Sequence, residues 1–348
     1  MNLDLLTSLC ELCGTSGREH DIRAFILHEL EQCGLPADAV KVDRLGNVLV
    51  HKKGASPAKR KVMFSAHMDE VALMVTDIHA DGTLAFDMVG GINAAAVIGR
   101  QVQVGKDRIS GVIGCKPVHL LSKDEKKKPA DMHSLFCDIG AASQAETEAL
   151  VRRGDIIYFC GDLHPFGEGS LRGKAIDDRF GCTLLLELLR KELPYDMDFA
   201  FVVQEEVGLR GAGVAAAQLD PDIAIVFEAT TAADLAGSSG ADRCCELGKG
   251  AVISYMDGRT IYDKELYDLT VSLCSEQNIP WQTKTKIAGG NDAGAIQSAG
   301  RGAKVLAVSV PCRYLHSPIS VIRQSDAEAC EALASAMISA LQEAQLDY

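Results

Sequence analysis

The chain has 348 residues, of which 47% are hydrophobic, enough to form the core of one large domain or two ordinary ones. Its 48 acidic and 35 basic residues give a formal net charge of −13, which argues against a protein that binds nucleic acid or an anionic membrane. No apolar run reaches the roughly 18 residues of a membrane-spanning helix. The amino terminus lacks the basic start of a signal peptide, and the twelve cysteines are irregularly spaced, so we expect a cytoplasmic protein with free thiols.

The first part of the chain predicts two helices. Residues 1–14 have an amphipathic helical pattern. Residues 16–33 predict a second helix, which begins with the capping-box spacing of Ser16 and Glu19 and ends at Gly34.

Two short strands follow, and the second ends in polar residues. The strands are predicted at residues 47–51 and 61–66, and the latter leads directly into His67, Asp69 and Glu70. In open parallel sheets the chemistry lies just beyond the carboxyl ends of the strands. This is therefore a candidate site segment.

The pattern changes between residues 70 and 160, where short β-like runs alternate with turn signals such as Asp81-Gly82. One short helix is expected near residues 141–152. We predict a small β-rich domain at 70–160, inserted into an α/β domain formed by 1–69 and 161–348. The strands of the insert are predicted at residues 71–78, 84–89, 101–104, 110–115, 134–139 and 156–159.

The α/β pattern then returns. A long helix is predicted at residues 174–189, with Asp177 and Asp178 at its amino end, where aspartate is common for capping reasons alone. Further helices are expected at 213–219 and 326–341.

The strands of this second α/β part also end in polar residues. The apolar run at 199–204 reads as a strand buried on both faces and stops at Glu205 and Glu206. Residues 222–227 predict a strand followed by Glu228. A last strand, at residues 304–310, leads towards a conspicuous His-Ser-Pro sequence.

The polar residues near these predicted strand ends and at the mouth of the central helix form one set of nitrogen and oxygen ligands. Such a set suits Zn²⁺, Co²⁺ or Mn²⁺, and it is large enough for two metals that share a carboxylate. Two metals about 3.5–4 Å apart can polarise a carbonyl group and activate a bridging water. The residues are His67, Asp69, Asp177, Glu205, Glu206, Glu228 and His316.

Five segments of the chain resemble, in order and spacing, those of the tetrahedral-aminopeptidase family of dinuclear metallopeptidases, which includes glutamyl aminopeptidases. The resemblance runs from the first helix to the last. The segments are SAHMDE at 65–70, KAIDDR at 174–179, QEEVG at 204–208, GGNDA at 289–293 and HSP at 316–318.

The resemblance implies an α/β fold of the zinc-exopeptidase type, with a mixed sheet flanked by helices and an inserted dimerisation domain. Its dimers would assemble into a tetrahedral dodecamer. The implied activity is the removal of the amino-terminal residue from peptides, with two divalent metal ions per subunit, zinc or cobalt first and manganese next.

The resemblance also implies a role for each ligand. Asp177 would bridge the two metals. His67 and Glu228 would complete one metal site, and Glu206 and His316 the other.

The same resemblance implies two further roles, and the chain departs from the family's pattern at two positions. Glu205 would be the general base, and Asp69 would orient His67. Most of the family has aspartate where this chain has Glu228, which bears on metal preference and spacing. Asn291 stands where the family has threonine, which bears on substrate specificity.

Three other functions fit parts of the sequence. The run of residues 211–216 fits the G-x-G-x-x-A of a nicotinamide-dependent oxidoreductase, but the glycines do not directly follow the strand, and close helix–sheet packing accounts for them. A metal-dependent deacylase or other amidohydrolase would use the same ligands. A non-enzymatic assembly protein could keep the fold without the activity. A cellulase is poorly supported, because Trp281 is the only tryptophan.

Overall fold

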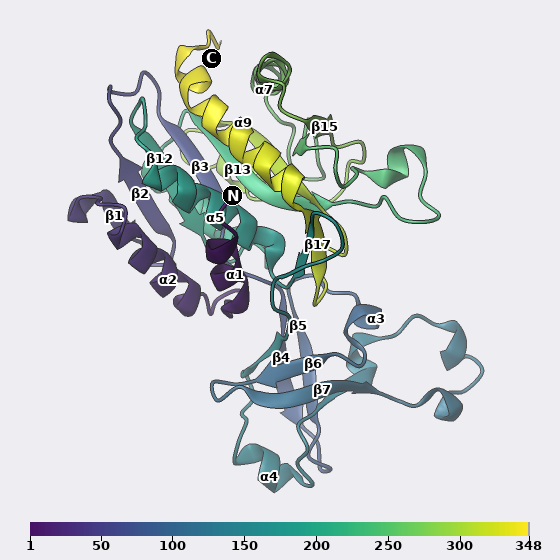
Figure 1. The fold of residues 1–348 in the computed structure, drawn as a ribbon. Coiled ribbons are helices and arrows are strands. Elements are labelled where there is room, and N and C mark those ends of the chain that lie inside the picture. Colours follow the sequence, from purple (N-terminus) through teal and green to yellow (C-terminus); the bar gives the residue numbers. More distant parts are fainter. Residues whose placement is uncertain (347–348) are drawn as a thin grey trace.

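The largest element is an eight-stranded mixed sheet with the strand order β1-β2-β12-β3-β13-β16-β14-β15 (Figure 1). It is seen in a computed structural model that describes residues 1–346. The four central strands β12, β3, β13 and β16 are parallel to one another, whereas β2 and β14 run antiparallel to their neighbours in this group. The strands are β1 (Val40–Val42), β2 (Val48–Lys52), β3 (Val62–His67), β12 (Met197–Val202), β13 (Ile223–Thr231), β14 (Ala251–Ile253), β15 (Trp281–Thr283) and β16 (Lys304–Cys312).

Helices cover both faces of this sheet, which confirms the predicted α/β class. Helices α5 and α9 pack on one face, with α1 beside α5, while α6 and α8 pack together against β12, β13 and β16. No helix in the described residues is long and apolar enough to cross a membrane. The helices are α1 (Leu3–Glu11), α2 (His20–Glu31), α5 (Ile176–Arg190), α6 (Arg210–Leu219), α7 (Lys264–Gln277), α8 (Ala293–Gln297) and α9 (Gln324–Glu343).

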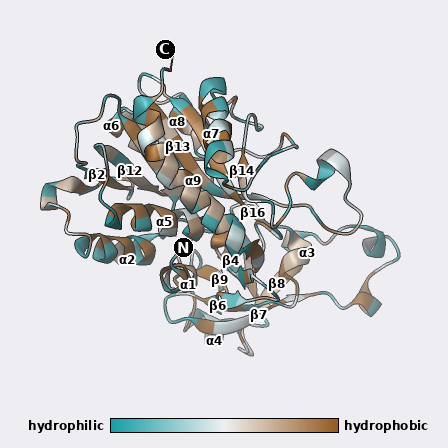
Figure 2. Ribbon diagram, turned by 45° about the horizontal axis from the view of Figure 1, so that its top comes forward, coloured by the Kyte–Doolittle hydropathy of each residue, from teal (hydrophilic) through white to brown (hydrophobic). Residues whose placement is uncertain are grey.

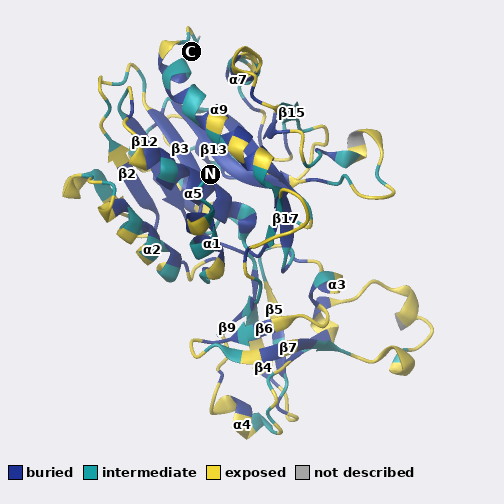
Figure 3. Cartoon of the chain, viewed as in Figure 1, coloured by how far each residue is buried: buried dark blue, intermediate teal, exposed yellow. Residues whose placement is uncertain are grey.

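Burial explains why the central strands are continuous apolar runs in the sequence. Every residue of β3 and β12 is buried, because helices cover both faces of the sheet. Figure 2 shows the apolar residues on the sheet and on the helix faces turned towards it, and Figure 3 shows the same elements as the buried part of the molecule.

A small closed barrel follows β3 and precedes the return of the chain to the large domain (Figure 1). Its buried hydrophobic side chains form a cluster separate from that of the α/β domain. The barrel carries two short helices, α3 (Ala94–Val97) and α4 (Gln144–Glu148). Its strands, in spatial order, are β4 (Ala72–Ile78), β5 (Leu84–Val89), β8 (Leu135–Asp138), β7 (Ile109–Cys115), β6 (Gln101–Val104) and β9 (Ile156–Phe159).

A three-stranded sheet joins two segments that are far apart in the sequence. It consists of β10 (His164–Pro165), β11 (Ser170–Gly173) and β17 (Ser320–Arg323). Gly173 of β11 pairs with Ser320 of β17. The start of α5 is thereby held beside the loop that precedes β17.

Several predicted boundaries are wrong, and the capping box is the clearest case. Helix α2 begins at His20, and its N-cap residue Glu19 makes no side-chain capping bond. The Ser16 hydroxyl donates instead to Asp69, 2.5 Å away. The helix predicted at 141–152 shrinks to α4.

Strand β13 is also longer than predicted, so Glu228 lies within it and not after it. The pairing with β16 continues as far as Thr231, opposite Cys312, which extends the strand past the glutamate. The run at 211–216 belongs to α6, and a Cβ on Gly211 would lie 2.4 Å from the Val203 carbonyl oxygen. Close packing of the helix on β12 therefore explains this glycine.

Candidate active site

The candidate ligands gather at the carboxyl edge of the parallel strands. His67 is the last residue of β3 and pairs with Val202, after which the chain of β12 continues to Glu205 and Glu206. Glu228 projects from β13, the strand on the other side of β3. The predicted convergence on one sheet edge is therefore present in the fold.

His67 lies among carboxylates in a fully buried position, with 1% of its side chain exposed. Its Nε2 is 3.3 Å from Asp177 Oδ1 and 3.6 Å from Glu228 Oε2. Its Nδ1 lies 3.0 Å from the main-chain oxygen of Asp69, which favours a proton on Nδ1 and leaves Nε2 free to ligate.

His316 stands on the other side of Asp177, in the loop between β16 and β17. Its Nε2 is 3.6 Å from Asp177 Oδ2 and 3.4 Å from Glu206 Oε2. The two oxygens of one aspartate thus face two imidazoles, and each imidazole has a glutamate of its own.

Asp69 fixes the segment that carries the two adjacent glutamates. Its carboxylate accepts hydrogen bonds from the main-chain N–H groups of Glu205 (2.9 Å) and Glu206 (3.2 Å), and from the Ser16 hydroxyl. The same carboxylate lies 3.5 Å from Nδ1 of His67. Asp69 therefore orients both the histidine and the turn after β12.

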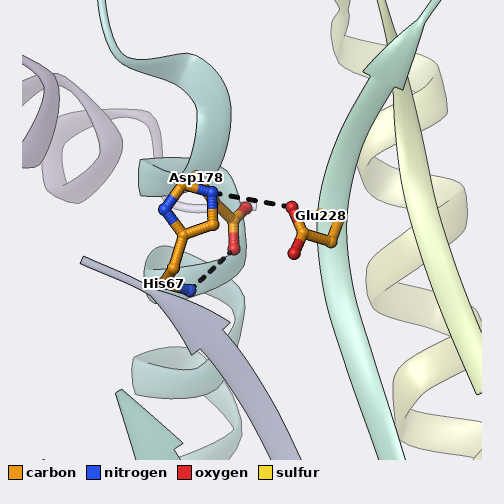
Figure 4. A group of neighbouring side chains, drawn as sticks. All are labelled: His67, Asp178 and Glu228. Atoms are coloured by element: carbon orange, nitrogen blue, oxygen red, sulfur yellow. Dashed lines mark hydrogen bonds and ion pairs between the residues drawn. The ribbon is translucent and has the colours of Figure 1, made fainter. Parts of the chain in front are cut away.

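Asp178, which the sequence analysis left without a role, lies beside this set (Figure 4). Its oxygens accept hydrogen bonds from the main-chain N–H groups of His67 (3.2 Å) and Gly181 (2.8 Å). Its neighbour Asp177 is joined to it by a cis peptide bond. The two N–H bonds make Asp178 a link between β3 and α5, whereas Asp177 directs its oxygens at the imidazoles.

Burial and crowding set the charges of the cluster. Burial works against a charged imidazole, but Glu228, Asp177 and Asp69 together hold the pKa of His67 well above its usual range. Burial opposes the charge of Asp177 as well, but hydrogen bonds from His316 and His67 lower its pKa.

The pKa values of the glutamates are raised, in contrast to that of Asp177. Burial and the neighbouring carboxylates raise the pKa of Glu206 to about 7, with His316 opposing the shift. Burial also raises the pKa of Glu205 and of Glu228 well above the usual range, and nearby acids add to the effect. The cluster therefore holds more negative charge than its own bases can balance.

The residues of this cluster fit divalent metal ions. Donor atoms of His67, Asp177 and Glu206 lie within 4.8 Å of one another, and so do donor atoms of His67, Asp178 and Glu228. Among the described residues, no group lies within hydrogen-bonding distance of the buried Oε1 of Glu228. A cation would satisfy this oxygen and relieve the crowding of carboxylates.

Asp292 is a second acidic residue whose position the sequence analysis did not foresee. It belongs to the quoted GGNDA segment, it is completely buried, and neither of its oxygens has a hydrogen-bond partner within the described part of the chain. Burial raises its pKa to about 7, and Asp69 adds to the shift while His67 opposes it. Its proximity to the cluster depends on the loop before α8, which no strand pattern predicts.

Glu70 directly follows Asp69 but belongs to a different cluster. Its carboxylate receives hydrogen bonds from Lys174 (2.9 Å), Arg179 (3.0 Å) and the main-chain N–H of Gly14 (2.9 Å). Burial opposes its charge, and the two bases nevertheless hold its pKa below the usual value. Glu70 is thus a compensated structural acid.

A cavity of about 520 Å³ opens above the carboxylate cluster. Asp177, Glu205, Glu206, Glu228 and His316 line one side of it. The other lining residues come from the turn after β12, from β13 and β16, from the loops that follow β13, β14 and β16, from the loop between β15 and α8, and from Gly91 after β5. The volume suits a small ligand or the end of a peptide chain.

Comparison with known proteins identifies the family. The profile of the M42 glutamyl aminopeptidase family matches residues 46–333. A lysyl aminopeptidase of Pyrococcus furiosus is 33% identical over 347 residues, with 97% of each chain covered.

Solved structures agree with this family. A TET aminopeptidase from the marine sediment archaeon Thaumarchaeota archaeon SCGC AB-539-E09 has a TM-score of 0.92 and 32% identity, with 99% of this chain and 96% of that chain covered. The TET1 peptidase of Pyrococcus horikoshii, which can assemble into a tetrahedron or a large octahedral shell, has a TM-score of 0.83 and 34% identity, with 97% and 98% covered. The resemblance noted in the sequence is therefore confirmed, and the chain belongs to the M42 glutamyl aminopeptidase family, a family of peptide-bond hydrolases.

Proposed function

We propose that this protein is an aminopeptidase that uses two divalent metal ions to release the amino-terminal residue of peptides. The observation that carries the proposal is the position of Asp177 between two imidazoles, each with its own glutamate. A single metal site would need only half of this arrangement.

Each half of the cluster supplies ligands for one ion. His67 and Glu228 would hold one metal, Glu206 and His316 the other, with Asp177 shared between them. When bound, such a pair of ions polarises the scissile carbonyl and activates a water. The extra methylene of Glu228, relative to the aspartate of most of the family, is accommodated within β13, from which its carboxylate reaches 3.6 Å from His67.

Glu205 is the side chain of the cluster best placed for proton transfer. It lines the cavity, and no ion pair in the described residues links its carboxylate to either histidine. Burial raises its pKa well above the usual range, and a raised pKa makes a carboxylate a stronger base. We assign Glu205 to remove a proton from the attacking water and deliver it to the nitrogen of the leaving group.

Asp69 supports this step without touching the substrate. Its bonds to the main-chain N–H groups of Glu205 and Glu206 fix the turn from which both side chains project. Both glutamates line the cavity, and Glu206 in addition lies 3.4 Å from His316. Adjacent residues can thereby take different roles.

We further propose that the protein is a homo-oligomer, with the barrel of residues 70–160 as its dimerisation domain. The assembling TET1 relative supports an oligomer. The barrel also exposes apolar side chains, with Val112 47%, Val118 70% and Leu120 59% exposed.

A cytoplasmic location is supported by the cysteines, all of which are free thiols.

The decisive experiment measures amino-acid release from Leu-, Glu- and Lys-peptides and from acetyl-blocked peptides, using metal-stripped protein with and without Co²⁺ or Zn²⁺. Metal-dependent cleavage of the free-amine peptides, with the blocked ones spared, is expected. Cleavage of the blocked peptides alone would make the protein a deacylase. No turnover with either metal would favour a non-enzymatic assembly protein.

Metal content is measured in parallel on wild-type protein and on the variants His67→Ala and His316→Ala. Each variant should bind less metal than the wild type. Unchanged stoichiometry in either variant would remove that histidine from the ligand set.

A further inference from the structure

Cys244 and Cys245 are the only adjacent cysteines in the chain, and the proposed peptide hydrolysis uses neither of them. They lie in the loop between β13 and β14, and both are buried, with 5% and 4% of the residue exposed. Cys244 nevertheless lines the cavity above the carboxylate cluster. A small molecule that enters this cavity can therefore reach a pair of thiols.

The two thiol groups interact with each other and with the end of β13. Cys245 forms a hydrogen bond with the sulfur of Cys244. Its Sγ also donates to the main-chain oxygen of Thr231, 3.3 Å away, and Thr231 lines the same cavity. The pair thus forms part of the contact between the loop and the strand that carries Glu228.

The main chain holds Cys244 in one conformation. Its φ angle of 61° lies in the left-handed region, which is uncommon for a residue other than glycine. Its main-chain oxygen accepts hydrogen bonds from the N–H (2.9 Å) and the hydroxyl (3.0 Å) of Thr285. The turn that carries the two cysteines is therefore fixed against the segment that follows β15.

The surroundings of the Cys244 sulfur favour negative charge. The main-chain N–H of Lys286 donates to this sulfur, and the ammonium groups of Lys284 and Lys286 both act on it. Lys286 is paired with Asp242 at 3.2 Å, whereas Lys284 Nζ bonds to the main-chain oxygen of Ala288 at 3.3 Å. N–H donors and cations of this kind stabilise a thiolate.

The two cysteines differ in protonation as a result. The hydrogen bond with Cys245, aided by the two lysines, lowers the pKa of Cys244 to about 6, although burial opposes the shift. The same hydrogen bond and burial raise the pKa of Cys245. Near neutral pH the pair therefore consists of a thiolate beside a thiol, which is the arrangement of a nucleophilic and a resolving cysteine.

We propose that Cys244 and Cys245 form a redox-sensitive dithiol that hydroperoxides oxidise to a disulfide. The Cys244 thiolate attacks the peroxide and forms an S–O bond. The O–O bond breaks, and the hydroxide that leaves takes a proton from solvent to become water. The Cys245 sulfur then attacks the sulfur of this sulfenic acid, an S–S bond replaces the S–O bond, and the second hydroxide leaves as water with the Cys245 proton. The two thiols are oxidised, and one peroxide is reduced to two waters.

The disulfide should be easily reduced. Adjacent Cα atoms are about 3.8 Å apart, whereas the Cα atoms of ordinary disulfides are about 4.4–6.8 Å apart, and a strained disulfide has a higher reduction potential. Closing the ring also takes the Cys245 sulfur from Thr231, so oxidation changes one wall of the cavity. Transient disulfides of this kind are compatible with a reducing compartment.

Peptide mapping by mass spectrometry tests the proposal on the intact protein. Trypsin cuts after Arg243 and Lys249, so both cysteines lie in one peptide, residues 244–249, which contains no other cysteine. The protein is loaded with Zn²⁺, which has no redox chemistry, treated with hydrogen peroxide near neutral pH, and alkylated. We expect this peptide to lose two hydrogen atoms and to resist alkylation, and dithiothreitol should restore both thiols.

The order of reaction distinguishes thiolate character from mere exposure. Cys13, Cys33 and Cys160 are more exposed than Cys244, but burial raises their pKa values. Exposure alone predicts that these three react first. We expect instead that the pair reacts about fivefold faster than any of them, because a larger thiolate fraction outweighs the lower nucleophilicity of a thiolate with a low pKa.

Variants assign the two roles. Cys245→Ser should form no disulfide and should accumulate a sulfenic acid at Cys244, which dimedone traps. Cys244→Ser should show neither product. The matched control Cys33→Ser, at a half-buried cysteine just after α2, should react as the wild type does. Circular dichroism checks that each variant is folded.

Three results would overturn the proposal. They are oxidation of the pair no faster than that of Cys33, oxidation of Cys244 without closure of the ring, and a disulfide between Cys244 and a cysteine other than Cys245. None of these measurements requires turnover of a substrate. Failure of the redox site would therefore leave the proposed aminopeptidase function untouched, and an inactive protein could still show the oxidation.

Discussion

Two buried acidic clusters lie side by side at the end of β3, and they are satisfied in opposite ways. Glu70 is surrounded by Lys174, Arg179 and a main-chain N–H, which lower its pKa. The cluster around Asp177 contains more carboxylates than bases, and the pKa values of its glutamates are raised.

The contrast teaches how to distinguish a structural acid from a functional one. A buried carboxylate is tolerable when the chain itself supplies the opposite charge. Where it does not, folding leaves an electrostatic cost that proton uptake or an external cation relieves, and such places are candidates for binding and catalysis. Asp69 and Glu70 are adjacent in the sequence and nevertheless belong to different clusters.

The largest expected effect comes from removing Glu205, the proposed proton-transfer group of the cluster around Asp177. Glu205→Gln should lower kcat/KM by about 10²–10⁴-fold because the variant lacks the base, while metal content and assembly stay unchanged. Steady-state kinetics together with metal analysis measure both. Retention of more than about a tenth of the activity would show that another group is the base.

A glutamate-to-glutamine substitution in the Glu70 cluster should change the stability of the fold. Glu70→Gln removes the charge that compensates Lys174 and Arg179 and should reduce the free energy of unfolding by about 3–5 kcal/mol. Urea denaturation followed by circular dichroism measures it, with the exposed Glu192→Gln as control. A loss no larger than that of the control would mean that the two bases find other partners.

In metal-stripped protein, the two clusters should change the stability of the fold in opposite directions as the pH rises. Glu206 has a pKa of about 7 in the fold, above its usual 4.5, so its burial costs stability increasingly as the pH rises from about 4.5 to about 7. Glu70 has a lowered pKa, so its stabilising contribution is complete above about 4.5 and is lost as the pH falls through the folded value.

The stability of the stripped protein should therefore fall between pH 5 and 7, and about 2–3 kcal/mol of this decrease comes from Glu206 and should be absent in Glu206→Gln. Glu205, Glu228 and Asp292, whose pKa values are also raised, should leave a remaining slope in the variant. Thermal unfolding measures both. Added metal should remove the decrease, because the ions neutralise the carboxylates. The same slope in wild type and Glu206→Gln would assign it to another group.

The smallest effect is expected from the hydrogen bond that the amino-terminal segment makes to the site, between Ser16 and Asp69. Ser16→Ala removes the hydroxyl that donates to Asp69. Because Asp69 keeps its two main-chain donors, we expect the free energy of unfolding to fall by about 1.5 kcal/mol or less. Kinetics should show a lower kcat with little change in KM. The control is Ser8→Ala, at a half-buried serine of α1 whose hydroxyl donates to the main-chain oxygen of Asp4. Equal effects of the two substitutions would show that the Ser16 bond is dispensable.

The sequence predicted the parts of the site that depend on regular structure. His67, Glu205 and Glu206 lie where apolar runs end, and the parallel order of β3 and β12 brings such ends together. The apolar pattern predicts Glu228 just after its strand, but pairing with β16 extends β13 past this residue, and the pattern of a single strand does not reveal how far its neighbour extends.

Other features depend on contacts between distant segments and had no local signal. Ser16 looked like a helix cap, since capping boxes are recognised by spacing alone, yet its hydroxyl is used by Asp69, 53 residues away. Asp292 becomes part of the site only because the loop before α8 folds back over the sheet edge. Asp178 lies beside Asp177, and its structural bonds could be recognised only from the atoms that it contacts.

The chain of the barrel comes close to two of the proposed metal ligands at Gly90 and Gly91, which follow β5. A Cβ on Gly90 would lie 3.3 Å from Glu206 Cβ, and one on Gly91 would lie 3.5 Å from His316 Nδ1. Gly91 also lines the cavity. A lone α/β domain would therefore lack part of the lining of this cavity, and a displacement of the barrel relative to that domain would first affect Glu206 and His316, the proposed ligands of one metal. The proposed dimerisation domain and the proposed metal site thus meet at two residues that have no side chain.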